Sequence, residues 1–127
     1  MKKGFYCKND NITYAGTHLL IELWGAKNIN SVKLVKKTLL AAVKACDVTL
    51  LSIDLHRFSP FNGISGVAVI KESHITIHTW PEFKYAALDI FVCGNASPYK
   101  AISVFKNGFK PKKIQIMDVK RGIFDYV

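Results

Sequence analysis

The stretch SGVAVIKESHITIHTWPEFKYAALDIFV, residues 65–92, reads as three candidate β-strands at 65–70, 74–79 and 86–92. The connections between them, 71–73 and 80–85, are short enough for hairpin turns. The stretch therefore predicts two consecutive antiparallel hairpins. It also places a carboxylate, a hydroxyl and two imidazoles in or beside the middle strand, which is unusual for a purely structural hairpin.

The expected hairpin register separates two groups of polar residues. Pairing the first two strands brings Ser65 near His78 and leaves Ser73 at the opposite end. Continuing the register through the second turn brings Cys93 beside Ser73. Five strand residues span about 16 Å, so His78 is not expected to reach Ser73 of its own chain. If His78 acts on Ser73, a partner chain must supply it, and a twofold dimer allows this.

The rest of the chain supplies the other elements of a small α+β domain. A strand is expected at 13–24, and another at 48–58. Between them, NSVKLVKKTLLAAVKAC (30–46) has apolar residues at helical spacing, and Ser31 can cap it.

A second helix is expected near residue 97, followed by a last strand at 112–119. Ser97 is the expected cap, Pro98 fits the first helical position and Gly108 fits the stop. The predicted order is βαβββαβ. It indicates a two-layer sandwich of one domain, 1–127, with two helices on one face of a largely antiparallel sheet.

Composition narrows the function classes. The 127 residues suit a single domain, half of them are apolar, and no apolar run approaches a membrane span. Three widely spaced cysteines (Cys7, Cys46 and Cys93) predict neither a disulfide framework nor a metal site, and they favour a reduced cytoplasmic protein. The net charge is +9, but the lysines are scattered, so nucleic-acid binding is not expected.

Four short motifs follow one another in the central region: GISG (63–66), ESH (72–74), HTWPE (78–82) and CG (93–94). In this order they closely resemble the small bacterial and archaeal S-adenosylmethionine decarboxylase proenzymes. These are pyruvoyl-dependent enzymes of polyamine and spermidine biosynthesis. The resemblance runs from GTHLLIELW to KRGIFDY and is densest over 56–94.

The resemblance implies that the chain cleaves itself between Glu72 and Ser73. The Ser73 hydroxyl attacks the preceding carbonyl, and the resulting ester undergoes β-elimination and hydrolysis to a pyruvoyl group. A β chain of 1–72 and an α chain of 73–127 remain together. Ser65 and His78 support this processing by family analogy.

The same resemblance implies the decarboxylation chemistry. The covalent pyruvoyl group forms a Schiff base with the substrate amine and accepts the electrons left when carbon dioxide departs, so it is the cofactor and no metal is needed. Cys93 matches the family's proton donor. The partners implied are a small-molecule substrate and a second copy of the chain, with the active sites at the dimer interface.

Substrate contacts follow from the family's use of aromatic stacking on adenine and a carboxylate on the ribose. Phe58, Tyr14 and Trp80 are candidates for stacking, and Glu82 is the candidate acid. His74 shares the strand face of His78 and is expected only to be solvated near the turn.

Two alternatives remain at this point. The loop between Phe58 and Ser65 carries one residue more than the usual bacterial pattern, which keeps open a pyruvoyl-dependent arginine or ornithine decarboxylase. A non-catalytic homologue is the other alternative. Such a chain would have no physical need to retain Glu72, Ser73, His78 and Cys93 together with Ser65.

Overall fold

The computed structural model describes residues 4–9 and 11–126, which form a seven-stranded antiparallel sheet and two α-helices. In chain order the elements are β1 (Cys7–Asn9), β2 (Ile12–Trp24), α1 (Val32–Ala45), β3 (Leu50–Phe58), β4 (Gly63–Ile70), β5 (Ser73–Trp80), η1 (Pro81–Phe83), β6 (Tyr85–Val92), α2 (Lys100–Phe109), β7 (Lys113–Ile123) and η2 (Phe124–Tyr126). The strand order is β7-β2-β6-β5-β4-β3, and β1 pairs with the first residues of β2.

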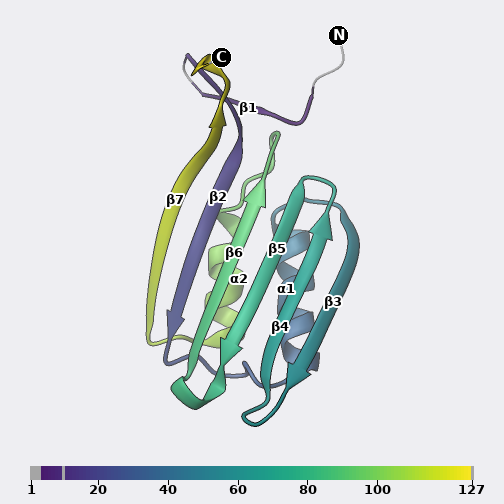
Figure 1. The fold of residues 1–127 in the computed structure, drawn as a ribbon, viewed down its shortest axis with the longest axis vertical. Helices are drawn as coiled ribbons and strands as arrows, with labels where there is room; N and C mark the ends of the chain where they lie inside the picture. Colours follow the sequence, from purple (N-terminus) through teal and green to yellow (C-terminus); the bar gives the residue numbers. More distant parts are fainter. Residues whose placement is uncertain (1–3, 10, 127) are drawn as a thin grey trace.

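Both helices cover the same face of the sheet (Figure 1), as expected for a two-layer α+β sandwich. Apolar residues alternate along the central strands, so that one face of each strand is buried against α1 and α2. The core residues include Leu19, Ile21, Ile75, Ile77, Ile90, Leu39, Phe105 and Phe109. Fold class and helix placement are therefore confirmed.

The opposite side of the sheet, which we call the open face, carries no helix within the described residues. Its strands present polar and titratable side chains, namely His18, Glu22, Ser65, His74, Thr76, His78 and Asp89. No helix of the described chain is long and apolar enough to cross a membrane.

The predicted register of the two hairpins is confirmed. Ser65 pairs with His78 across β4 and β5, and Ser73 pairs with Val92 across β5 and β6. Cys93 follows directly, so it lies beside Ser73 as expected. The first turn is tighter than predicted, because Ile70 already pairs with Ser73.

The predicted ranges 48–58, 65–70, 74–79 and 86–92 give four strands between the helices, and the structure confirms all four as β3 to β6. The order βαβββαβ is therefore wrong only in its count, because it omits one of the four predicted strands. The short β1 is an addition, formed because Cys7 to Asn9 pair with the start of β2.

Helix α1 begins as predicted, because the Ser31 hydroxyl accepts from the Leu34 backbone N–H at 3.2 Å. Helix α2 differs from the prediction at both ends. It begins at Lys100, because the backbone around Pro98 closes with bonds from residue i+3 to residue i, so Ser97 is not the cap. It also continues through Gly108, where a Cβ would lie 2.6 Å from the Thr38 side chain of α1. Gly108 therefore permits close helix packing and does not end the helix.

A buried threonine ties the sheet to the loop before α1. Thr79 is 1% exposed; its hydroxyl donates to the Ile29 carbonyl at 2.8 Å and accepts from the Ile64 N–H at 2.8 Å. Thr79→Val keeps the shape but leaves both backbone groups unpaired, so we expect a loss of about 1–3 kcal/mol in the free energy of unfolding. Urea unfolding checks this, with the exposed Thr49→Val as control. Equal stability of the two variants would contradict it.

Candidate functional site

The peptide bond between Glu72 and Ser73 lies at a conformationally strained point. Ser73 is the first residue of β5, and its φ is +152°, a region that residues with a Cβ rarely adopt. Such a conformation costs on the order of 1–3 kcal/mol, and it persists only where the surrounding structure enforces it. Here the tight turn and the pairing of Ser73 with Val92 enforce it.

Two hydrogen-bond donors of Cys93 converge on the carbonyl oxygen of Glu72. The backbone N–H of Cys93 donates at 3.1 Å, and its thiol donates at 3.0 Å. Burial raises the pKa of the Cys93 thiol above its ordinary value, although its backbone hydrogen bond opposes the shift. The thiol is therefore protonated at neutral pH and able to donate. Paired donors on one carbonyl oxygen are the arrangement that stabilises an oxyanion.

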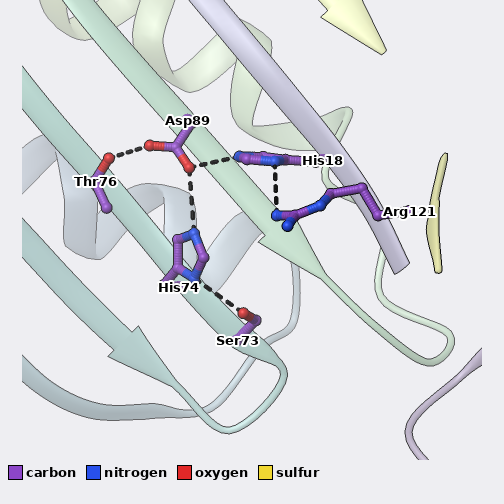
Figure 2. A network of polar contacts seen from close by, with 6 residues as sticks. All are labelled: His18, Ser73, His74, Thr76, Asp89 and Arg121. Carbon is purple, nitrogen blue, oxygen red and sulfur yellow. Dashed lines mark hydrogen bonds and ion pairs between the residues drawn. The ribbon is translucent and has the colours of Figure 1, made fainter. Parts of the chain in front are cut away.

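The hydroxyl of Ser73 is engaged from within the same chain (Figure 2). Its Oγ lies 3.0 Å from Nδ1 of His74, and Nε2 of His74 lies 3.3 Å from Oδ2 of Asp89. The hydroxyl of Thr76 donates to the other carboxylate oxygen of Asp89. The Ser73 hydroxyl is therefore held by a hydrogen bond to the side chain of the next residue.

The network extends across the sheet from Asp89 to β2 and β7. His18 Nε2 lies 2.7 Å from Oδ2 of Asp89, and His18 Nδ1 lies 3.3 Å from Nη1 of Arg121. The guanidinium of Arg121 also lies 4.8 Å from the centre of the Phe91 ring. A single carboxylate thus joins two imidazoles and, through one of them, an arginine.

The sequence prediction missed this network. His74 was expected to be solvated, and His18, Asp89 and Arg121 were not predicted as site residues. His18, His74 and Asp89 also form a group of possible metal ligands whose donor atoms lie within 4.8 Å of one another, where no metal site was expected. The hairpin register could have identified the pairing of Thr76 with Asp89, but not the position of His18 on a strand distant in sequence.

The other end of β5 carries a separate group of residues. Ser65 and His78 face each other across β4 and β5. The His78 ring lies 5.2 Å from the Phe58 ring and 4.3 Å from the Trp80 ring. His78 is five residues from Ser73 along an extended strand, about 16 Å, so one chain does not bring these two residues together.

The predicted substrate contacts are divided between the two ends. Tyr14 is buried on β2 opposite Cys7, near the Ser73 end. Phe58 is 41% exposed, and it lies with Trp80 at the His78 end. Glu82, in η1 after Trp80, is exposed. The four residues therefore form no single clamp within one chain.

Two hollows adjoin these groups. One of about 330 Å³ lies beside the Glu72–Ser73 bond and is lined by Glu72, Cys93, Asp47 and Lys100, among others. A wider hollow of about 640 Å³ lies on the open face, where its lining includes Ser65 and His78 together with His18 and Asp89. His18, His78 and Asp89 are thus accessible from the open face, whereas Cys93 lines the smaller hollow.

A strained peptide bond, a hydroxyl on its C-terminal side and two donors on its carbonyl oxygen are what an intramolecular acyl shift requires. The arrangement is therefore chemically capable of an acyl shift at the Glu72–Ser73 bond.

Comparisons with known proteins point to one family. The family model for S-adenosylmethionine decarboxylase matches residues 17–122. An S-adenosylmethionine decarboxylase proenzyme of Methanococcus maripaludis is 48% identical over 113 residues, 87% of this chain and 92% of the relative. A proenzyme of the same name from Thermomicrobium roseum is 43% identical over 109 residues, 85% of this chain and 94% of the relative.

A solved structure shows the same fold. The crystal structure of the adenosylmethionine decarboxylase from Aquifex aeolicus has a TM-score of 0.78 and 36% sequence identity, and the match covers 85% of this chain and 91% of that one. The chain belongs to the S-adenosylmethionine decarboxylase family.

Proposed function

We propose that this chain is a self-cleaving, pyruvoyl-dependent enzyme that decarboxylates S-adenosylmethionine and so makes an aminopropyl donor for spermidine biosynthesis. The observation that carries the proposal is the placement of both Cys93 donors on the carbonyl oxygen of Glu72, next to the hydroxyl of Ser73. The names of the relatives support the substrate.

Self-cleavage begins with attack of Ser73 Oγ on the carbonyl carbon of Glu72. Negative charge then develops on the carbonyl oxygen, where the N–H and thiol of Cys93 already donate. Collapse of the tetrahedral adduct breaks the bond between the Glu72 carbon and the Ser73 nitrogen, leaving an ester. The positive φ of Ser73 favours this step, because opening the peptide bond relieves the strain.

A base then removes the α-proton of residue 73. The bond between Cβ and Oγ of residue 73 breaks, and Glu72 leaves with a new main-chain carboxylate. Hydrolysis of the resulting dehydroalanine releases ammonia and produces the pyruvoyl group. The geometry around Ser73 fits this group, since its backbone is held at the sheet end beside a hollow of about 330 Å³. When present, the pyruvoyl carbonyl supplies the electron sink for loss of carbon dioxide.

The partner subunit completes the site. Ser73 and Cys93 lie at one end of β5, and Ser65, His78, Phe58 and Trp80 at the other. A twofold dimer through the open face reverses one strand against its copy, and this brings opposite ends together. We therefore assign the partner subunit's Ser65 and His78 to processing, with His78 as the acid or base.

The same arrangement unites the substrate contacts. Tyr14 of one chain would approach Phe58, Trp80 and Glu82 of the partner, giving aromatic surfaces for adenine and a carboxylate for the ribose. None of these proposed steps uses a metal ion. The three cysteines are free thiols, as suits the reducing cytoplasm in which we place the enzyme.

The substrate is tested by a panel of labelled amino acids. We expect purified, processed protein to release labelled carbon dioxide from carboxyl-labelled S-adenosylmethionine and not from arginine or ornithine. An aromatic clamp favours the adenine of the first substrate, whereas a guanidinium or ammonium tail would need a carboxylate partner. Release from arginine or ornithine alone would replace the proposed substrate. Release from none, by fully processed protein, would refute decarboxylation of all three.

Two substitutions of Cys93, to serine and to alanine, test its proposed role as the proton donor in decarboxylation. We expect Cys93→Ser to retain a hydroxyl donor to the Glu72 carbonyl and to process, but to decarboxylate about 10²–10⁴-fold more slowly, because a hydroxyl is a much weaker acid than a thiol. Cys93→Ala should also process more slowly, having lost one oxyanion donor. The kcat per pyruvoyl group, counted by mass spectrometry, is the measurement. An unchanged kcat in the serine variant would remove Cys93 from the proton-transfer role.

A further inference from the structure

We propose that His74, oriented by Asp89, is the base that removes the proton from the Ser73 hydroxyl at the start of self-cleavage, and that it acts within its own chain. This inference rests on the proposed self-cleavage and assigns the one proton transfer that the family motif leaves without a residue. His74 is the catalytic residue in this scheme. Asp89 is a positioning residue.

The donors and acceptors around Asp89 determine which nitrogen of His74 carries its proton. An ionised carboxylate only accepts hydrogen bonds. Oδ1 of Asp89 accepts from Thr76, and Oδ2 is hydrogen-bonded to Nε2 of His18 at 2.7 Å. The same Oδ2 lies 3.3 Å from Nε2 of His74 as an ion-pair contact, and the negative charge favours a proton on that nitrogen too. With Nε2 protonated, a neutral His74 has its lone pair on Nδ1. That nitrogen lies 3.0 Å from Ser73 Oγ and accepts its hydroxyl proton.

The contacts of His18 place its proton on Nε2 as well, the nitrogen that faces Asp89. Arginine only donates, so Nδ1 of His18, 3.3 Å from Arg121 Nη1, must be the acceptor. The proton of a neutral His18 is therefore on Nε2, which points to Asp89 at 2.7 Å. Each N–H or O–H group from Arg121 to Ser73 then faces an acceptor, through a hydrogen bond or, between His74 and Asp89, through an ion-pair contact at 3.3 Å. This consistency assigns the tautomer of His74 without any reference to the reaction.

The reaction step balances on these residues alone. The Ser73 hydroxyl proton moves to Nδ1 of His74 as Oγ bonds to the carbonyl carbon of Glu72. The carbonyl π electrons move onto its oxygen, and the oxyanion that forms is stabilised by the two Cys93 donors. Asp89 stabilises the positive charge that His74 acquires, as a carboxylate does beside a catalytic imidazole. His74 then returns the proton to the departing nitrogen of residue 73. The product is an ester with a free amine, and no further reactant is consumed.

The surroundings strengthen the interaction of His74 with Asp89. The side chains of His18, Asp89 and His74 are 16%, 22% and 34% exposed, so water screens the carboxylate only in part. A metal on Nε2 of His74 would shift its proton to Nδ1 and abolish the base. Zn²⁺ bound at these ligands should therefore slow cleavage.

This assignment divides the two proton transfers between two chains. His74 serves the attack by Ser73 in the same chain, whereas the partner subunit's His78 serves the later elimination. The two histidines should therefore block processing at different covalent states: loss of His74 stops the chain before the ester, and loss of His78 stops it after the ester. Hydroxylamine at neutral pH distinguishes these states because it cleaves the ester and leaves the peptide bond between residues 72 and 73 intact. Cleavage at Asn62-Gly63 or Asn107-Gly108, which occurs under alkaline conditions, is recognised by its different fragment masses.

The test follows cleavage of freshly folded protein by denaturing mass spectrometry, with and without hydroxylamine, in His74→Gln, Asp89→Asn and His78→Ala. His56→Gln is the matched control, because His56 forms an exposed pair with Asp54 at 3.0 Å that is not joined to Ser73. We expect His74→Gln to cleave about 10²–10⁴-fold more slowly than wild type and to resist hydroxylamine. Asp89→Asn should slow the same step, and imidazole added to His74→Ala should restore cleavage in part.

Three outcomes would overturn the inference. They are wild-type cleavage by His74→Gln, accumulation of a hydroxylamine-sensitive ester in that variant, or faster cleavage on addition of Zn²⁺. If His74→Gln does not unfold cooperatively, the rate and hydroxylamine response of Asp89→Asn decide by the same criteria. An uncleaved wild-type chain under every folding condition would instead refute the proposed self-cleavage itself, so the two failures are distinguishable.

Discussion

Ser73→Ala will remain a single chain of 14.2 kDa and release no carbon dioxide from S-adenosylmethionine. The substitution removes the hydroxyl that attacks the Glu72 carbonyl, and no neighbouring group can form the same ester from the same position. Both cleavage and the electrophilic carbonyl should therefore be lost completely. Denaturing mass spectrometry of wild type should show fragments 1–72 and 73–127, the later one without a free amine at its N-terminus.

The fold of this variant should be preserved. Alanine at position 73 keeps the Cβ, so the cost of the positive φ is unchanged and the pairing with Val92 is retained. Ser52→Ala, an exposed serine on β3, is the matched control and should process and decarboxylate as wild type does. Decarboxylation by an intact Ser73→Ala chain would show that the ketone on residue 73 is not the reactive group.

Two inactive variants, Ser73→Ala and His78→Ala, should restore processing when they are produced together. In a mixed dimer the His78→Ala chain keeps its own Ser73, His74 and Cys93 and receives His78 from the Ser73→Ala chain. It should therefore complete its cleavage. The Ser73→Ala chain should remain intact in every dimer. At equal expression about half of the dimers are mixed, so about half of the His78→Ala chains should be processed.

An affinity tag on one of the two chains identifies which of them is cleaved. Each variant produced alone is the control, and neither should give a pyruvoyl fragment. Cleavage that stays absent in dimers shown to be mixed would mean that His78 acts in its own chain or not at all. The proposed dimer geometry would then fail, whereas the assignment of Ser73 would stand on the first experiment.

The local part of the site followed from the sequence. The lengths of the turns at 71–72 and 81–84 determine the hairpin register, and a hairpin register depends on residues close in sequence. For this reason turn length and strand length alone place Ser65 opposite His78, and Cys93 beside Ser73. The separation of His78 from Ser73 also followed, because strand length is nearly constant per residue.

Other features depended on contacts between distant parts of the chain. Helix α2 was predicted to begin near residue 97 and to stop at Gly108, but it begins at Lys100 and continues through Gly108. Both predictions were wrong because cap and stop preferences are weak when helix packing opposes them. The positive φ of Ser73 also arises from its place at a sheet end, since nothing in the residue type of serine favours that conformation.

The sequence by itself determined the α+β class, the central hairpins and the motif residues around the Glu72–Ser73 bond, because period, turn length and motif are local properties. Only the tertiary structure decided that His18 and Arg121 join Asp89 and His74. Strand β2 lies between β6 and β7, and both pairings connect segments far apart in the chain. Pairings between segments so far apart in the chain are not encoded by any local pattern, because they depend on how the whole sheet assembles.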